Sequence, residues 1–352
     1  MADQTIKSVN PANDTVIEEF TPHTPAQVAT AIRDADECFA DWRKTSFEYR
    51  AGLMLKAADV LEANADRYAA DMTAEMGKPL GQARAEVNKC AWVCRHYAER
   101  AATYLADEPI ESSGTKAYVR LLPLGVILAV MPWNFPFWQV VRFAAPAITA
   151  GNAILLKHAP CVPGCAEALE TLFADAGYPA GLFANLFIDV EATGEVIDHE
   201  LVRAVSLTGS VRAGRAVASR AGAAIKKCVL ELGGSDPSLV LADADLDAAV
   251  ASCALGRLFN SGQSCVAAKR FVVVDAIRDA FEQKLTARLE AATMGDPMDA
   301  GTELGPLARV DLRDALHDQV QRSVAGGARL VMGGSVPDRP GAWYPATLLA
   351  DV

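Results

Sequence analysis

The chain has 352 residues, of which 51% are hydrophobic and 22% charged, a composition typical of a globular protein with about two domains. The formal net charge is −11 and no block of lysine and arginine stands out, so neither a nucleic-acid partner nor an anionic membrane surface is expected. The longest apolar run, residues 121–133, is too short to span a bilayer and contains two prolines, so no membrane partner is expected either.

The N-terminus and the cysteines favour a cytoplasmic location. The start, MADQTIKSVN, has no basic segment followed by an apolar one, so we expect no secretory signal. The eight cysteines form no CxxC pair, and their density is far below that of a disulfide scaffold. The pairs 90/94 and 161/165 suit one helix face, but no histidine lies at zinc-ligand spacing, so we expect helix packing and no metal site.

The first hundred residues are predicted to be mainly helical. Residues 8–22 suggest a short hairpin around Asn13 and Asp14. From Pro25 to about Asp107, apolar residues recur at i, i+3 and i+4, which predicts helices. A break at residues 108–115 precedes a strand-like segment, residues 116–130.

Strands and helices then alternate, which predicts βαβ units and a mostly parallel sheet. The expected strands are residues 153–159, 183–190 and 204–209, and the expected helices are residues 161–177, 191–200 and 211–222. A second α/β set has strands at 238–243 and 270–274 and helices at 245–259 and 276–292. We place a domain boundary at residues 230–234, which divides the chain into 1–230 and 231–352.

The stretch FNSGQSCVAAKR, residues 259–270, places Cys265 on a polar turn, although most free cysteines are buried as small hydrophobes. Backbone N–H groups at such a turn can lower the pKa of a thiol, and the thiolate is the good nucleophile. A structural thiol is an equally simple reading. None of the five histidines pairs convincingly with Cys265 by sequence, so a Cys-His hydrolase is not favoured.

Two polar residues stand at unusual places. Glu231 lies between an apolar strand and two glycines; a carboxylate there is costly unless it is solvated, paired or functional, although a helix cap or turn would also explain it. Asn134 lies between two prolines in MPWNFPFWQ, a rigid loop that suits an amide donor for developing negative charge. A lone Asn more commonly serves loop backbone groups.

Three further residues suit a nucleotide. Gly209 and Ser210 follow a strand and open a helix, where a phosphate can bind, although Ser is also an ordinary helix cap. Lys157 ends a strand, where open α/β sheets bind ligands, but a solvated surface lysine would look the same.

Together, PWNFP, LLKHA, LTGS, LELGGSDP and GQSC resemble, in this order and spacing, the aldehyde dehydrogenase superfamily. The variants KHA, ELGGSDP and GQSCVAAKRF are most similar to its bacterial succinate-semialdehyde dehydrogenases. The resemblance runs from Asn10 to the last residue. It implies an α/β fold with a Rossmann-type NAD(P)-binding domain, an oligomerisation arm around residues 111–124, and a partial catalytic thiol domain.

By this resemblance, Cys265 is the nucleophile, Glu231 the general base and Asn134 the oxyanion donor. The implied reaction is NAD(P)-dependent oxidation of an aldehyde through a thiohemiacetal and a hydrolysed thioester. Glu231 also distinguishes the chain from members that pass the acyl group to coenzyme A. The cofactor-binding residues it implies are Trp133, Asn134, Lys157, Pro160, Gly209, Ser210 and Leu232.

The resemblance also bears on cofactor and substrate. NAD-preferring relatives often carry a Glu where this chain has Pro160, so we expect NADP in preference to NAD. Arg142 matches an arginine that binds the distal carboxylate of succinic semialdehyde; a salt-bridged helix residue is the alternative. A second such arginine is replaced by Phe259, which keeps other aliphatic or aromatic aldehydes open.

The chain ends at WYPATLLADV, where members of the superfamily continue. Because parallel sheets need both faces covered, we expect exposed apolar surface. We therefore expect a fragment, or a natural truncation with poor stability and weak or no turnover. A full-length protein would form a homodimer or homotetramer. The alternatives are an inactive homologue that keeps nucleotide binding or a structural role, and a thiol-based redox or acyl-transfer enzyme.

Overall fold

The computed structural model describes residues 5–352, which form two compact units. The first unit consists of residues 5–6, Glu19–Tyr68 and Arg84–Glu231; the second consists of Lys7–Glu18, Ala69–Ala83 and Leu232–Val352. The last change of unit falls at Glu231, but two segments from the first hundred residues group with the second unit. The assignment of cofactor binding to one domain and thiol chemistry to the other stays a prediction.

The N-terminal part of the chain is helical, as the apolar spacing predicts. Its helices are α1 (Pro25–Trp42), α2 (Phe47–Ala63), α3 (Ala65–Met76) and α4 (Leu80–Tyr104). Helix α1 begins with a capping box, in which the side chain of Thr24 accepts a hydrogen bond from the Gln27 N–H and the Gln27 side chain accepts one from the Thr24 N–H. The continuous helical segment read from the sequence is therefore four helices, because turns interrupt it.

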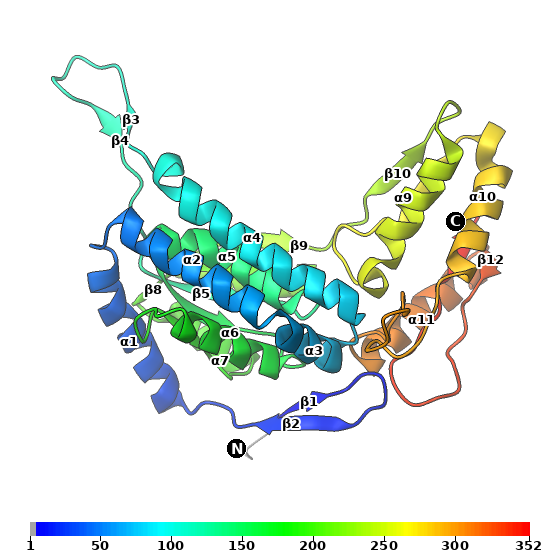
Figure 1. Ribbon diagram of the computed structural model, residues 1–352, viewed down its shortest axis with the longest axis horizontal. Helices are drawn as coiled ribbons and strands as arrows, with labels where there is room; N and C mark the ends of the chain where they lie inside the picture. The colour runs from blue at the N-terminus through cyan, green and yellow to red at the C-terminus, as the bar shows by residue number, and fades with distance from the viewer. Residues whose placement is uncertain (1–4) are drawn as a thin grey trace. The chain divides into compact units, whose positions relative to one another are not determined.

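A five-stranded sheet organises the first unit (Figure 1). Its order is β7 (Phe183–Asn185), β6 (Ala153–Lys157), β5 (Val126–Val130), β8 (Val202–Gly209) and β9 (Lys227–Leu232). The pairs β5–β6, β6–β7 and β5–β8 are parallel, which confirms the predicted topology. Helices α5 (Pro136–Thr149), α6 (Pro163–Asp175), α7 (Val190–Asp198) and α8 (Val211–Ala223) lie in the connections.

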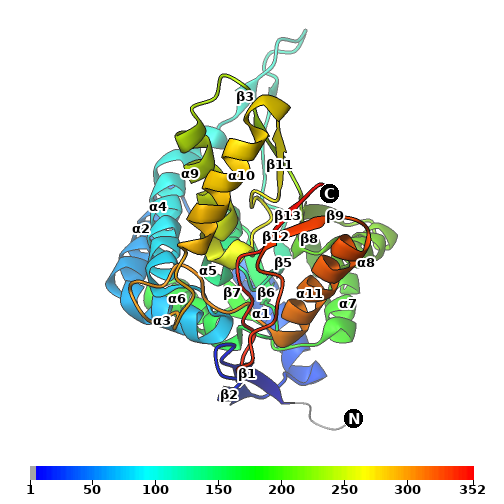
Figure 2. The ribbon, with the colours of Figure 1, turned by 90° about the vertical axis from the view of Figure 1, so that its right-hand side faces the viewer.

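Helices lie on both sides of this sheet, as Figure 2 shows. The apolar strands β5 and β6 are consequently buried along nearly their whole length. Only their last residues, Val130 and Lys157, are partly accessible. The side chains that can meet a ligand therefore lie at and beyond the strand ends.

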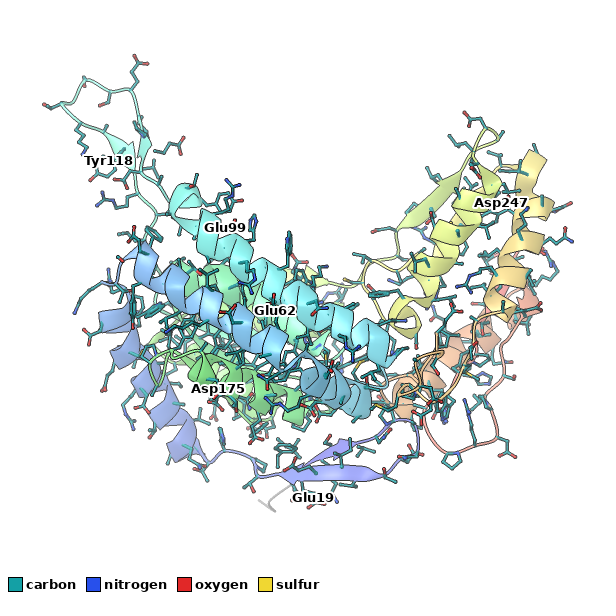
Figure 3. The ribbon with its side chains drawn as sticks, viewed as in Figure 1. Glu19, Glu62, Glu99, Tyr118, Asp175 and Asp247 are labelled. Carbon is teal, nitrogen blue, oxygen red and sulfur yellow. The ribbon has the colours of Figure 1, made fainter. Side chains whose placement is uncertain are left out.

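The second unit contains a smaller parallel pair, β10 (Pro237–Val240) and β11 (Arg270–Val273). Helices α9 (Leu246–Leu258) and α10 (Asp275–Glu290) pack together over an apolar core, and an ion pair of 2.6 Å joins Asp247, labelled in Figure 3, to Lys284. The other face of the β10–β11 strand pair carries exposed apolar residues such as Leu239 and Val272, as expected for a parallel sheet with an uncovered face.

The C-terminal region contains elements that the sequence reading missed. They are α11 (Val310–Ala325), β12 (Arg329–Met332) and the antiparallel partner of that strand, β13 (Leu348–Ala350). Most residues of helix α11 are exposed, and Val320 is its one buried residue among those described. A helix with so narrow an apolar face gives a weak periodic signal.

Two small strand pairs also form. β1 (Ile6–Val9) pairs with β2 (Val16–Phe20), and Asp14 in their turn has a φ of 61°, which confirms the predicted N-terminal hairpin. β3 (Glu108–Pro109) pairs antiparallel with β4 (Tyr118–Val119), the hairpin on which Figure 3 labels Tyr118. The role of this hairpin in oligomerisation stays a prediction.

Several predicted strands are too long; the expected strands 153–159 and 238–243, for example, end at Lys157 and Val240. The segment 116–130 contains β4 and β5, but residues 120–125 between them are not strand. The segment 183–190 is strand only over β7, because Asp189 caps the start of α7 by accepting a hydrogen bond from the Ala192 N–H at 2.8 Å. Apolar composition alone does not distinguish a strand from the extended chain that leads into or out of it.

Across residues 5–352, no helix combines the length and apolar character that a membrane crossing requires.

Candidate functional site

The carboxyl ends of β5, β6 and β8 lie at one edge of the large sheet, because these strands are parallel and adjacent. Val130 is in register with both Lys157 and Leu207. The chain adds β6 and β7 on one side of β5 and then returns to place β8 on the other side. Such a reversal is where open α/β sheets bind ligands. The predicted site residues at or directly after these strand ends are Trp133, Asn134, Lys157, Pro160, Gly209 and Ser210.

The loop that carries Trp133 and Asn134 leads directly into α5, and Glu86 of α4 fixes the start of that helix. One oxygen of the buried Glu86 carboxylate accepts hydrogen bonds from the N–H groups of Phe137 at 3.0 Å and Trp138 at 2.9 Å. Helix α5 has no side-chain cap of its own, so Glu86 satisfies N–H groups that would otherwise lack a partner. A negative charge is also favourable at a helix N-terminus.

His158 holds the same loop from the side of β6. Its Nδ1 accepts a hydrogen bond from the Ala159 N–H at 2.8 Å, so its Nε2 carries the proton and donates to the carbonyl of Pro136 at 3.0 Å. Burial lowers the pKa of His158 to about 4, which keeps the ring neutral at neutral pH. His158, the residue after Lys157, therefore connects the end of β6 to Pro136, which opens α5.

Lys157 lies at the end of β6, where it is partly buried. Desolvation lowers its pKa, while the neighbouring Cys161 and Asp189 act in the opposite direction. Pro160, three residues later, is exposed. No carboxylate stands at the position of Pro160, so nothing at that residue would repel a phosphate.

Gly209 ends β8, and Ser210 caps α8. The Ser210 hydroxyl accepts a hydrogen bond from the Ala213 N–H at 3.2 Å. The alternative reading of Ser210 as an ordinary helix cap is thus observed. Ser210 is also exposed at the N-terminus of a 13-residue helix, which is a favourable place for a phosphate.

Arg142 and Glu231 meet at a cavity of about 460 Å³ within the first unit. The walls come from the end of α4, from α5 and from β8 and β9, and most of them are apolar. The Arg142 Nε donates to Gln139 Oε1 at 2.7 Å, and its Nη2 donates to Thr208 Oγ1 at 3.2 Å and lies 3.8 Å from Glu231 Oε2. The predicted alternative, a salt-bridged helix arginine, is observed together with the position at the cavity.

Cys265 follows an irregular turn in the second unit. Asn260, Ser261 and Gly262 all have positive φ values, of 54°, 52° and 75°. Asn260 is fully buried, and its N–H donates to Gln82 Oε1 at 2.7 Å. Left-handed non-glycine residues cost free energy and persist only where their surroundings determine them.

Further hydrogen bonds hold this turn. The Ser261 hydroxyl donates to the Gly305 carbonyl at 3.2 Å and accepts from the Gly305 N–H at 3.1 Å. Gln263 Oε1 accepts from the Ala308 N–H at 2.9 Å, and the Gln263 amide nitrogen Nε2 donates to the Asn260 carbonyl at 3.2 Å. The result is a partly accessible, unpaired thiol on a well-anchored turn.

The segment after Glu231 lies beside Cys265. Lys269 donates hydrogen bonds to the carbonyls of Gly234 and Cys265, the latter at 3.1 Å, and the Arg270 guanidinium donates to the Ser235 carbonyl at 2.9 Å. Lys269 thus joins the motifs LELGGSDP and GQSC, and Arg270 adds a hydrogen bond to the first of them. Leu232 belongs to the second unit, as these residues do.

The structure therefore assembles the predicted residues in two groups, one in each unit. Those at the sheet edge, together with Arg142 and Glu231, belong to the first unit, and Cys265 and Leu232 belong to the second. The catalytic arrangement of Cys265 with Glu231 and Asn134 stays a prediction. Among residues 5–352, no group of three or more His, Cys, Asp or Glu side chains is arranged to hold a metal ion.

The sequence reading missed the residues that hold the site in place. These residues are Gln82, Glu86, Gln139, His158 and Thr208. Each acts through a hydrogen bond to a predicted site residue or to the segment that carries it. Two motifs gave a visible signal: LLKHA, which contains His158, and LTGS, which contains Thr208.

Known proteins that share the sequence and fold of this chain identify its family. Residues 1–352 match the model of the aldehyde dehydrogenase family. The chain is 48% identical over 347 residues to a probable succinate-semialdehyde dehydrogenase (NADP(+)) of Synechocystis, which covers 99% of this chain and 76% of that protein. It is 47% identical over 345 residues to a succinate semialdehyde dehydrogenase (NAD(P)+) of Escherichia coli, with coverage of 98% and 75%.

The chain belongs to the aldehyde dehydrogenase family. The crystal structure of succinic semialdehyde dehydrogenase from Streptococcus pyogenes in complex with NADP+ superposes with a TM-score of 0.96 at 38% identity, covering 99% of this chain and 76% of that one. The predicted aldehyde dehydrogenase fold is therefore confirmed, as is membership of an NAD(P)-dependent enzyme family. The chain spans about three quarters of the length of these relatives.

Proposed function

We propose that this aldehyde dehydrogenase oxidises succinic semialdehyde to succinate and prefers NADP⁺ to NAD⁺. The observation that carries the substrate assignment is the Arg142 guanidinium at the wall of the cavity that Glu231 also lines. An arginine presents a fork of N–H donors that matches a carboxylate. The names of the relatives from Synechocystis and Escherichia coli agree with this substrate.

The residues at the sheet edge fit a dinucleotide. The edge lies at the reversal of strand order, and Ser210 opens an exposed helix N-terminus. In this proposal, that N-terminus would face the pyrophosphate, and Lys157, at the end of β6, would bind the adenosine ribose. Trp133, Gly209 and Leu232 would complete the contacts. When bound, the cofactor supplies a hydride acceptor. The absence of a carboxylate at Pro160 supports NADP⁺, whose 2′-phosphate a carboxylate would repel.

In the proposed reaction, the Cys265 thiolate attacks the aldehyde carbon and gives a thiohemiacetal whose oxyanion the Asn134 amide stabilises. Loss of hydride leaves a thioester, and Glu231 takes a proton from the water that hydrolyses it to the acid. Glu86 and His158 support this scheme because they fix the loop of Asn134, and the anchored turn before Cys265 limits the positions of the thiol. Glu231 lies three residues before Gly234 in the chain. The carbonyls of Gly234 and Cys265 both accept hydrogen bonds from Lys269.

Arg142→Ala tests the substrate. We expect KM for succinic semialdehyde to rise about 10- to 100-fold, because a hydrogen bond to a charged group is worth about 1.5–3 kcal/mol. KM for butanal, which has the same chain length but no carboxylate, should change little. Equal changes for the two aldehydes would contradict the carboxylate role and favour an uncharged substrate, which the mostly apolar cavity would also accept.

Pro160→Glu tests the cofactor preference. The new carboxylate should hydrogen-bond the ribose hydroxyls of NAD⁺ and repel the phosphate of NADP⁺. We expect kcat/KM to shift toward NAD⁺, with Pro160→Gln as a neutral control of similar size. An unchanged ratio of the two efficiencies in Pro160→Glu would refute the assignment.

A further inference from the structure

The Arg142 guanidinium has N–H donors that are not used in hydrogen bonds within residues 5–352. Its hydrogen bonds to Gln139 and Thr208 use Nε and Nη2, and within residues 5–352 no hydrogen bond uses Nη1. Gln139 is buried, so the bond at 2.7 Å fixes the guanidinium plane at the cavity wall. The fork is therefore oriented before any ligand arrives.

Glu231 is held much less firmly than Arg142. Its carboxylate is the ionic partner of Arg142 at 3.8 Å, which is beyond hydrogen-bond distance. The side chains are 30% exposed for Arg142 and 56% exposed for Glu231, so water screens their attraction. Accessible pairs of this kind contribute little and separate easily.

We propose that Glu231 and the distal carboxylate of the substrate compete for Arg142, so that a carboxylate-bearing aldehyde releases the general base as it binds. This inference rests on the proposed function, in which Arg142 binds the substrate and Glu231 activates water. Without substrate, Glu231 partly neutralises Arg142. A bound carboxylate with direct hydrogen bonds to the fork replaces this weak partner, and the Glu231 side chain is then free to turn toward the thioester.

Through this competition, the distal carboxylate of the substrate affects the hydrolysis of the thioester as well as substrate binding. An uncharged aldehyde would leave Glu231 beside Arg142 and would be hydrolysed less readily once attached to Cys265. When a carboxylate-bearing aldehyde binds, only the small free energy of the screened Arg142–Glu231 pair is lost, because Gln139 and Thr208 continue to hold the arginine. One ion pair thereby links recognition of the distal carboxylate to the final step.

Succinate binding, measured by titration calorimetry at low salt, tests the proposal without turnover. Glu231→Gln removes the competitor and keeps the size of the side chain, so it should bind succinate about two- to fivefold more tightly than the wild type. Arg142→Ala should bind it much more weakly. Glu191→Gln, which removes an exposed carboxylate from α7, is the matched control and should leave the affinity unchanged.

The double variant separates competition from general repulsion. If Glu231 acts through Arg142, Glu231→Gln should have no effect on succinate affinity in the Arg142→Ala background. A gain that persists there, or no gain in the single variant, would overturn the competition while leaving Arg142 as the carboxylate site. Unchanged succinate affinity in Arg142→Ala would instead overturn the proposed substrate assignment itself.

Discussion

The sheet edge of the first unit and the turn before Cys265 position their side chains in different ways. At the edge, regular parallel pairing brings Lys157, Gly209 and the loop of Asn134 to one level, and buried polar residues refine the loop. At the turn, no regular element fixes the backbone. Three consecutive positive φ values are held instead by hydrogen bonds: the Asn260 N–H donates to Gln82, and the N–H groups of Gly305 and Ala308 donate to the side chains of Ser261 and Gln263.

This difference shows where each site is vulnerable. The sheet edge depends on the buried His158, whose ring is neutral, and on the buried Glu86 carboxylate, which caps α5, so changes in their protonation should disturb it. The turn depends on backbone conformations that few residues adopt, so changes in side-chain size should disturb it.

The largest expected effect is the pH dependence caused by His158. Its pKa is about 4 in the folded protein, below its ordinary value of 6.5, so between these values the unfolded state binds more protons. The stability that the neutral ring contributes is complete above pH 6.5 and is lost as the pH falls toward 4. The loss amounts to about 3 kcal/mol.

Urea unfolding of the wild type and of His158→Asn from pH 7 to pH 4 measures this loss. The advantage of the wild type in free energy of unfolding should shrink by about 3 kcal/mol over that range. A difference between the two proteins that stays constant with pH would show that His158 does not contribute through its neutral form.

Gly262→Ala should disturb the turn. A β-carbon at Gly262 would overlap the guanidinium of Arg257, and its φ of 75° is unfavourable for alanine. We expect a loss of about 1–3 kcal/mol in the free energy of unfolding and slower alkylation of Cys265. Gly52→Ala, inside α2 with open space around it, should instead stabilise the protein by about 0.5–1 kcal/mol. Similar effects of the two substitutions would mean that the turn is not specially constrained.

The smallest expected effect is that of replacing Ser210, which caps its helix in the same way as Ser46 does. Each caps a helix by accepting a hydrogen bond of 3.2 Å, from Ala213 in one case and Tyr49 in the other. Replacement of either by Ala should cost about 1 kcal/mol of stability. Only Ser210→Ala should also raise KM for NADP⁺, because only this helix opens at the sheet edge. Equal cofactor affinity in the two variants would reduce Ser210 to a helix cap.

The sequence by itself determined the family, the alternation of strands and helices, and the candidate site residues at the strand ends. These features depend on local signals: apolar runs, glycines and prolines at turns, and short motifs such as PWNFP and GQSC. It predicted the ends of strands less accurately, and it did not predict α11, where the apolar face is narrow.

Only the tertiary structure decided which residues support the site. Glu86 reaches α5, Gln82 reaches Asn260, and Arg142 meets Glu231 through contacts between segments far apart in the chain. Such contacts leave no periodic trace in the sequence, because a buried carboxylate or amide is spaced along its own helix like any other polar residue. Folding places the partner group opposite each of them, and the hydrogen bond that results is what gives the residue its role.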